Sequence, residues 1–147
     1  YCSERGINTS LTTNGTLIDE EMAERIADSG LTFLNFSLDS FDPEIHDEGR
    51  GVEGTHRKVL KAIDCMDMKG SPEILINSLV HAKNLDQLED LVEWVEDREG
   101  VSGITFQPIA SPDFFGGEYS NYIFRAISSL YSRTSEILPE GFKQKIN

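Results

Sequence analysis

Apolar and polar residues alternate along the chain in short segments that follow two different periods. Segments of period two, rich in β-branched and aromatic residues, predict strands. Segments in which apolar residues recur every three or four positions predict helices with one buried face. The strands are expected at residues 7–13, 33–38, 74–80 and 104–109. The helices are expected after Asp19, after Asp42, over residues 55–69, after Asn84 and over residues 120–138.

Several helices have recognisable start signals. Asp19 and Asp42 are suited to cap the helices that follow them, and Pro43 occupies the first helical position after Asp42, where proline is favoured. Asn84 is followed three residues later by Gln87, a spacing that predicts a capping box. These signals separate the expected helices from the strands before them.

The alternation of strand and helix predicts an α/β fold of parallel βαβ units with right-handed crossovers. Two architectures fit this order: a doubly wound sheet, or part of a (β/α) barrel, whose full form takes about 250 residues. No GxGxxG or GxxxxGK[ST] loop follows any expected strand, which disfavours the first architecture without excluding it. A chain of 147 residues is sized for one domain.

Each expected strand also carries a row of polar residues. Because strand side chains point alternately to opposite faces, Asn35 and Ser37 share one face while Leu34 and Phe36 share the other. Such groups would each cost about 1–3 kcal/mol if they were buried without partners. The matching residues on the other strands are Ser10, Thr12 and Asn14, then Asn77 and His81, then Thr105 and Gln107. Any one of them could close a turn instead, but together they predict a polar ligand cavity at the strand ends.

Charge and composition narrow the class of function. The chain has 13 basic and 26 acidic residues, a formal net charge of −13, and no Lys and Arg cluster of the kind that nucleic-acid binding requires. No apolar run approaches the roughly 20 residues of a membrane span. The two cysteines, Cys2 and Cys65, have no metal-ligand spacing, and their pattern without a secretory signal predicts a cytoplasmic location. The chain does not begin with Met and is expected to be a piece of a longer protein.

Four residues with reactive or aromatic side chains are interpreted as structural. His46 and Asp47 are expected on the surface of the short helix after Asp42, rather than as metal ligands. Trp94, beside an apolar helical stripe, is expected to pack, and Cys65 is expected to be a small core residue. The sequence therefore predicts no metal site in this chain, and no residue is assigned a catalytic role.

Four segments, in this order, resemble the later strands of the radical S-adenosylmethionine (radical SAM) superfamily, in the branch with molybdenum-cofactor and SPASM-type peptide-modifying enzymes. They are residues 12–17 (TTNGTL), 35–40 (NFSLDS) with 50–51 (RG), 76–80 (INSLV) with Asn84, and 104–109 (ITFQPI). The resemblance covers about residues 7–110 and implies part of a (β/α)6 partial TIM barrel, with about four strands and four to five helices. Residues 1–147 would be a truncated core domain, in which residues 111–147 form a C-terminal loop and helix.

The resemblance implies that the intact enzyme cleaves S-adenosylmethionine reductively at a [4Fe–4S] cluster. The resulting 5′-deoxyadenosyl radical would abstract hydrogen from a small-molecule or peptide substrate. It also implies that Ser37 contacts the ribose or amino-acid moiety of S-adenosylmethionine, and that Arg50 binds its carboxylate. The further cofactor-binding residues implied are Thr13, Asn14, Asp39, Gln107 and Ile109.

The family holds its cluster in a CxxxCxxC loop that this sequence lacks, and Cys2 and Cys65 cannot replace it. The chain alone is therefore expected to bind neither cofactor and to be inactive. Its strand at residues 7–13 would present an open edge, which predicts self-association.

Two other interpretations stay open. One is a non-catalytic α/β module that binds a small polar ligand or a partner protein. The other is a different barrel enzyme, such as an aldolase or dehydratase. No Lys stands at an expected strand end and no carboxylates converge from two strands, which disfavours the barrel enzyme. A CxxxCxxC motif upstream of Tyr1 would decide for the radical SAM interpretation.

Overall fold

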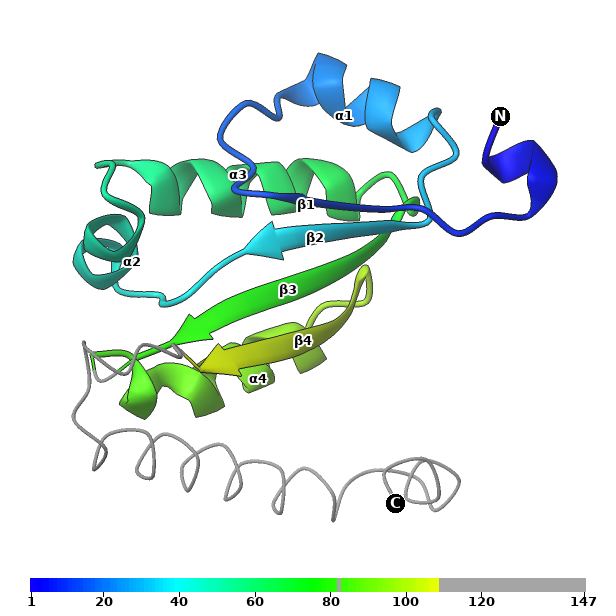
Figure 1. Cartoon of the computed structure of the whole chain (residues 1–147). Coiled ribbons are helices and arrows are strands. Elements are labelled where there is room, and N and C mark those ends of the chain that lie inside the picture. The colour runs from blue at the N-terminus through cyan, green and yellow to red at the C-terminus, as the bar shows by residue number, and fades with distance from the viewer. Residues whose placement is uncertain (82, 109–147) are drawn as a thin grey trace, which may run out of the picture.

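The computed structural model describes residues 1–81 and 83–108. In this part of the chain, four parallel strands alternate with helices and form one sheet in the order β1-β2-β3-β4 (Figure 1). The strands are β1 (Ser10–Thr13), β2 (Phe33–Ser37), β3 (Glu73–Val80) and β4 (Val101–Pro108). The α-helices are α1 (Glu20–Ala27), α2 (Pro43–Arg50), α3 (Thr55–Asp67) and α4 (Leu88–Glu96), with 3-10 turns at Ser3–Arg5 and Leu85–Gln87. The predicted α/β fold with parallel strands is confirmed.

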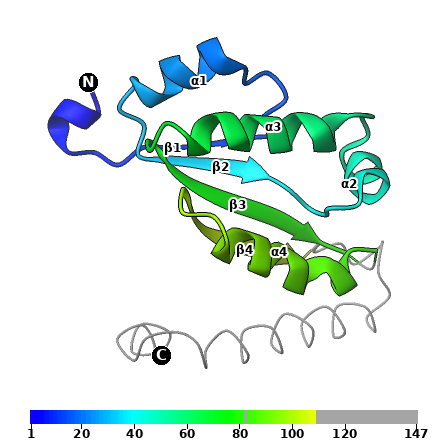
Figure 2. The ribbon, with the colours of Figure 1, turned by 180° about the vertical axis from the view of Figure 1, so that it is seen from behind.

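The helices cover one face of the sheet, as the two opposite views show (Figures 1 and 2). Leu34 and Phe36 of β2 point to this face and are fully buried, as is Ile76 of β3. Asn35 and Ser37 point to the other face and are half-buried. Among the described residues, this second face carries no helix, and it is called the open face below.

Helix α3 supplies the centre of the apolar core. Its residues Val59, Ile63 and Met66 recur at helical spacing and are fully buried. They belong to one cluster with Leu34 and Ile76 of the sheet. None of the helices in the described ranges is both long enough and apolar enough to span a membrane.

The predicted starts of the first two helices are confirmed. The Asp19 carboxylate accepts a hydrogen bond from the Met22 N–H at 2.9 Å, and Asp42 accepts one from the Glu44 N–H at 2.8 Å. The predicted capping box is wrong. Residue 84 precedes a 3-10 turn, and neither Asn84 nor Gln87 caps a helix with its side chain.

The edge strands differ from their predicted bounds. β1 begins at Ser10 because the Ile7 N–H bonds to the Cys2 carbonyl in a preceding turn instead of to a neighbouring strand. β4 begins three residues early, at Val101, and a register shift next to Ile74 lets Gly103 join the ladder. The expected helix at 120–138 lies outside the described residues.

Candidate functional site

Polar side chains from all four strands lie next to one another on the open face. The register sets Thr12 of β1 beside Asn35 of β2. Two residues after Asn35, toward the carboxyl ends of the strands, Ser37 is the direct neighbour of Asn77 on β3, and Asn77 is the direct neighbour of Thr105 on β4. Adjacent strands in a sheet are about 4.8 Å apart, so the three side chains form a continuous row. The prediction of a shared polar face is confirmed for the five residues that the register pairs, Thr12, Asn35, Ser37, Asn77 and Thr105.

These polar residues differ in what they bind. Asn35 donates from Nδ2 to the Ser10 Oγ at 2.7 Å and thus holds β1 against β2. The side chains of Ser37, Asn77 and Thr105 make no hydrogen bond to another residue in the described ranges. They are half-buried or exposed. Within the described part of the chain, the donors and acceptors of these three side chains are therefore unused.

Asp39 and Arg50 form an ion pair at the carboxyl end of β2. The Arg50 Nη2 lies 2.6 Å from the Asp39 Oδ1, and the Asp39 side chain is only 2% exposed. The same Oδ1 accepts a hydrogen bond from the Leu79 N–H at 2.8 Å, so Asp39 also bonds to β3. The Arg50 Nε is buried and has no partner among the described residues. A guanidinium with a free donor, fixed by a buried carboxylate, is suited to bind an anionic or carbonyl oxygen.

His46 belongs to the same cluster, which corrects the prediction that it lies on the helix surface. It is 2% exposed, and its Nδ1 accepts a hydrogen bond from the Asp39 N–H at 3.2 Å. His46 and Arg50 are four residues apart on α2, so both face the end of β2. Burial lowers the pKa of His46 to about 4, against the raising effect of the Asp39 carboxylate. The imidazole is therefore neutral near pH 7.

Asp47 has a structural role at the start of α3. Its Oδ1 accepts hydrogen bonds from the Thr55 hydroxyl at 2.6 Å and from the His56 N–H at 2.7 Å, and its Oδ2 accepts one from the Gly54 N–H. These donors stand at the start of α3, where backbone N–H groups have no partner within the helix. The bonds lower the pKa of Asp47 to about 2, the Thr55 hydroxyl contributing most. Asp47 thus fixes α2 against α3.

The end of β1 is a tight turn. Thr13 Oγ1 accepts a hydrogen bond from the Gly15 N–H at 3.0 Å, and the Asn14 Oδ1 accepts one from the Thr16 N–H at 3.1 Å. Gly15 has a φ of +70°, and a Cβ there would lie 2.9 Å from the Phe36 ring. Both predicted site residues therefore have local partners, whereas Gln107 is exposed beside Leu79 in the register. Ile109 lies outside the described residues.

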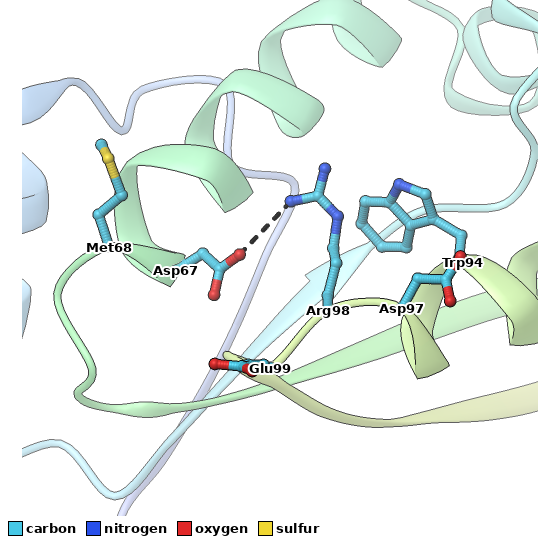
Figure 3. Close-up of a pocket in the computed structure, with 6 residues that line it drawn as sticks. All are labelled: Asp67, Met68, Trp94, Asp97, Arg98 and Glu99. Atoms are coloured by element: carbon cyan, nitrogen blue, oxygen red, sulfur yellow. Dashed lines mark ion pairs between the residues drawn. The ribbon is translucent and has the colours of Figure 1, made fainter.

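A separate hollow of about 580 Å³ lies where α3 and α4 end (Figure 3). Arg98 follows α4 and reaches across the hollow to Asp67 of α3, at 3.6 Å (Figure 3). It also bonds to Asp64 of α3 at 2.7 Å, and its guanidinium lies 4.3 Å from the centre of the Trp94 ring. The Trp94 packing expectation is supported by a second ring contact, to Phe41 at 5.5 Å. Since α3 and α4 each end just before a strand begins, this hollow is at the end of the sheet opposite to Asp39 and Arg50.

Comparison with known proteins decides the family. A family model described as the Radical SAM superfamily matches residues 1–95. The chain belongs to the radical SAM superfamily. The PqqA peptide cyclase of Granulibacter bethesdensis is 29% identical over 113 residues, which cover 77% of this chain and 29% of that protein. The GTP 3′,8-cyclase of Microcystis aeruginosa is 36% identical over 110 residues, which cover 72% of this chain and 33% of that protein.

Solved structures share the fold of this chain. SuiB of Streptococcus suis has a TM-score of 0.71 at 20% identity, covering 95% of this chain and 32% of SuiB. The structure of SuiB bound to S-adenosylmethionine gives a TM-score of 0.69 at 19% identity, covering 92% of this chain and 32% of SuiB. This radical SAM chain thus spans 29–33% of the length of these relatives.

Proposed function

We propose that the carboxyl ends of β1–β4 bind S-adenosylmethionine in the whole protein. Ser37 would contact the ribose or amino-acid moiety, and Arg50 would bind the carboxylate. Family membership and the SuiB structure with S-adenosylmethionine support this proposal. The observation that carries it is the Arg50 guanidinium, held by the buried Asp39 while its own Nε has no partner in the described ranges.

The other residues at the carboxyl ends of the strands, a region called the mouth below, have supporting roles in this proposal. Asp39 positions Arg50 and does not itself contact the cofactor. Asn77, Thr105 and Gln107 provide uncharged donors and acceptors on the open face, suited to hydroxyl and amide groups. Thr13 and Asn14 shape the turn that borders the mouth. The cofactor contact of Ile109 stays a prediction.

In the whole protein, S-adenosylmethionine bound beside a [4Fe–4S] cluster would supply radical chemistry that removes hydrogen from a substrate. The residues of this chain do not fit the cluster itself. Cys65 of α3 is only 6% exposed and belongs to the apolar core, and Cys2 lies before β1. Among the described residues, no three His, Cys, Asp or Glu side chains are placed to hold a metal ion. We infer that residues outside this chain hold the cluster and that the chain alone is inactive.

The substrate, a small molecule or a peptide, would lie over the open face beside the cofactor. The relatives include a peptide cyclase and a GTP cyclase, so both classes fit the family. We further infer a cytoplasmic location, since both cysteines are free thiols. The exposed edge at β1, where Leu11 is 44% exposed, supports self-association of the isolated chain.

The proposal is tested by changing Ser37 to Phe in the full-length protein with its cluster reconstituted. A bulky ring on the open face would occupy the cofactor position, so 5′-deoxyadenosine formation should be lost. Ser102→Phe is the matched control, because Ser102 is an exposed serine near the start of β4, at the other end of the sheet from the mouth. Undiminished 5′-deoxyadenosine formation by Ser37→Phe would contradict the proposed site.

A further inference from the structure

Asn84 connects the ends of β2 and β3 by three hydrogen bonds. It is fully buried in the turn that follows β3. Its Nδ2 donates to the carbonyl oxygens of Asp39 at 2.6 Å and Leu79 at 2.9 Å. Its Oδ1 accepts from the His81 N–H at 2.8 Å. Since a carboxamide has two N–H donors, both donors of Asn84 are used.

These bonds stand where the backbone ladder between the two strands stops. Ser37 and Asn77 are the last residue pair in register between β2 and β3. Two residues later on β3, the Leu79 N–H bonds to the Asp39 carboxylate, and the Leu79 carbonyl bonds to Asn84. Buried backbone groups need partners. The side chains of Asp39 and Asn84 therefore provide the bonds that a continuing β2 would have made.

Asp39 is in turn held at every polar group. Asn84 bonds to its carbonyl, the His46 Nδ1 to its N–H, and the Leu79 N–H to its carboxylate. The oxygen that bonds to Leu79 is also the one that lies 2.6 Å from the Arg50 Nη2. A shift of the Asp39 backbone would therefore move the guanidinium of Arg50.

We propose that Asn84 is a positioning residue for the cofactor site: it fixes Asp39 and, through Asp39, the orientation of Arg50. This inference rests on the proposed binding of S-adenosylmethionine by Arg50. Asn84 touches no ligand in this proposal and acts only through Asp39 and Arg50. Its substitution should therefore change the affinity for S-adenosylmethionine only while Arg50 is present.

The test is a double-mutant cycle for S-adenosylmethionine binding, measured by equilibrium dialysis on the full-length protein. Asn84→Ala should weaken binding roughly tenfold, the scale on which supporting side chains affect a bound group. In an Arg50→Ala background, Asn84→Ala should weaken binding no further, because the residue through which it acts is gone. Asn84→Ser keeps one donor and should give a smaller loss with the same coupling. If Asn84→Ala does not fold, Asn84→Ser takes its place in the double-mutant cycle.

Arg98→Ala is the control for a general loss of stability. Arg98 joins α3 to α4 at the opposite end of the sheet, so its loss should leave the affinity unchanged in both backgrounds. The positioning role of Asn84 would be overturned if its variants weakened S-adenosylmethionine binding equally with and without Arg50, or did not weaken it at all. Either result would leave the proposed function intact. If the unmodified protein does not bind S-adenosylmethionine, the proposed function fails, and this inference fails with it.

Discussion

The carboxylate of Asp47 lies at the start of α3, where its Oδ1 is 2.7 Å from the backbone nitrogen of His56. This contact joins α2, which carries Arg50, to the helix at the centre of the core. Together with the Asp47 bonds to the Thr55 hydroxyl and the Gly54 N–H, it helps to hold α2 at the end of β2.

Replacing Asp47 with Asn should destabilise the chain. The amide keeps the shape but weakens the bonds to the Thr55 hydroxyl and the His56 N–H, since charged acceptors bind more strongly. The urea midpoint of unfolding, followed by circular dichroism, should fall. Asp28→Asn, at the exposed end of α1, is the matched control and should leave the midpoint nearly unchanged. Equal midpoints for the two variants would contradict the role of Asp47.

The same carboxylate should contribute to acid unfolding. The pKa of Asp47 is about 2 in the folded chain, against an ordinary value of 3.8. The unfolded chain therefore binds a proton on Asp47 at a higher pH than the folded chain, and stability is lost as pH falls from 3.8 to about 2. In Asp47→Asn, the free energy of unfolding should depend less steeply on pH over this range.

A second pH effect is expected from His46 at higher pH. Burial lowers its pKa from 6.5 to about 4, so between these values the unfolded chain binds a proton that the folded chain does not. The free energy of unfolding should therefore decrease as pH falls from 6.5 to about 4. Burial also lowers the pKa of His56 and His81, which adds to the trend in the same direction.

His46→Asn isolates the contribution of His46, because an Asn oxygen can still accept the Asp39 N–H bond but does not titrate. Its unfolding free energy should vary less with pH over this range than that of the unchanged chain. A pH dependence identical in both proteins would show that the buried imidazole is not the source.

Ser78→Ala should leave stability unchanged or raise it by about 1 kcal/mol, the scale of one unsatisfied buried hydroxyl. Ser78 points to the helix-covered face, is 1% exposed, and its Oγ has no partner among the described residues. Chemical denaturation measures the difference. A loss of stability would show that the hydroxyl has a partner that this structure does not contain.

Leu11→Lys should reduce self-association of the isolated chain. Leu11 lies on β1, at one edge of the described sheet, and a charged residue on an edge strand opposes pairing with another chain. Sedimentation velocity should show dimers or larger species for the unchanged chain and monomers for the variant. Leu17→Lys is the control, because Leu17 is 85% exposed and lies outside the strands. A monomeric unchanged chain would contradict the proposed association.

The fold could be predicted because its signals are local. The alternation of Leu34 and Phe36 with Asn35 and Ser37 identifies both the strand and its two faces from four residues. Parallel pairing followed from the alternation of strands with helices, which restricts the connections. The open polar face was therefore visible in the sequence.

The network around Asp39 could not be predicted in the same way, because its members come from three separate segments. Asn84 bonds to a carbonyl 45 residues earlier in the chain, and only the folded sheet shows that this carbonyl needs a donor. The local spacing of Asn84 and Gln87 suggested a capping box instead. The burial of His46 had one available signal, its spacing of four residues from Arg50 on a helix that follows a strand-end Asp.

A crystal structure of the full-length protein with S-adenosylmethionine bound is the most direct test of the proposed site. The ligand should lie on the open face, against Ser37, with its carboxylate at the Arg50 guanidinium. Density for the ligand in the hollow beside Trp94 and Arg98, or anywhere away from Ser37 and Arg50, would contradict the proposed function.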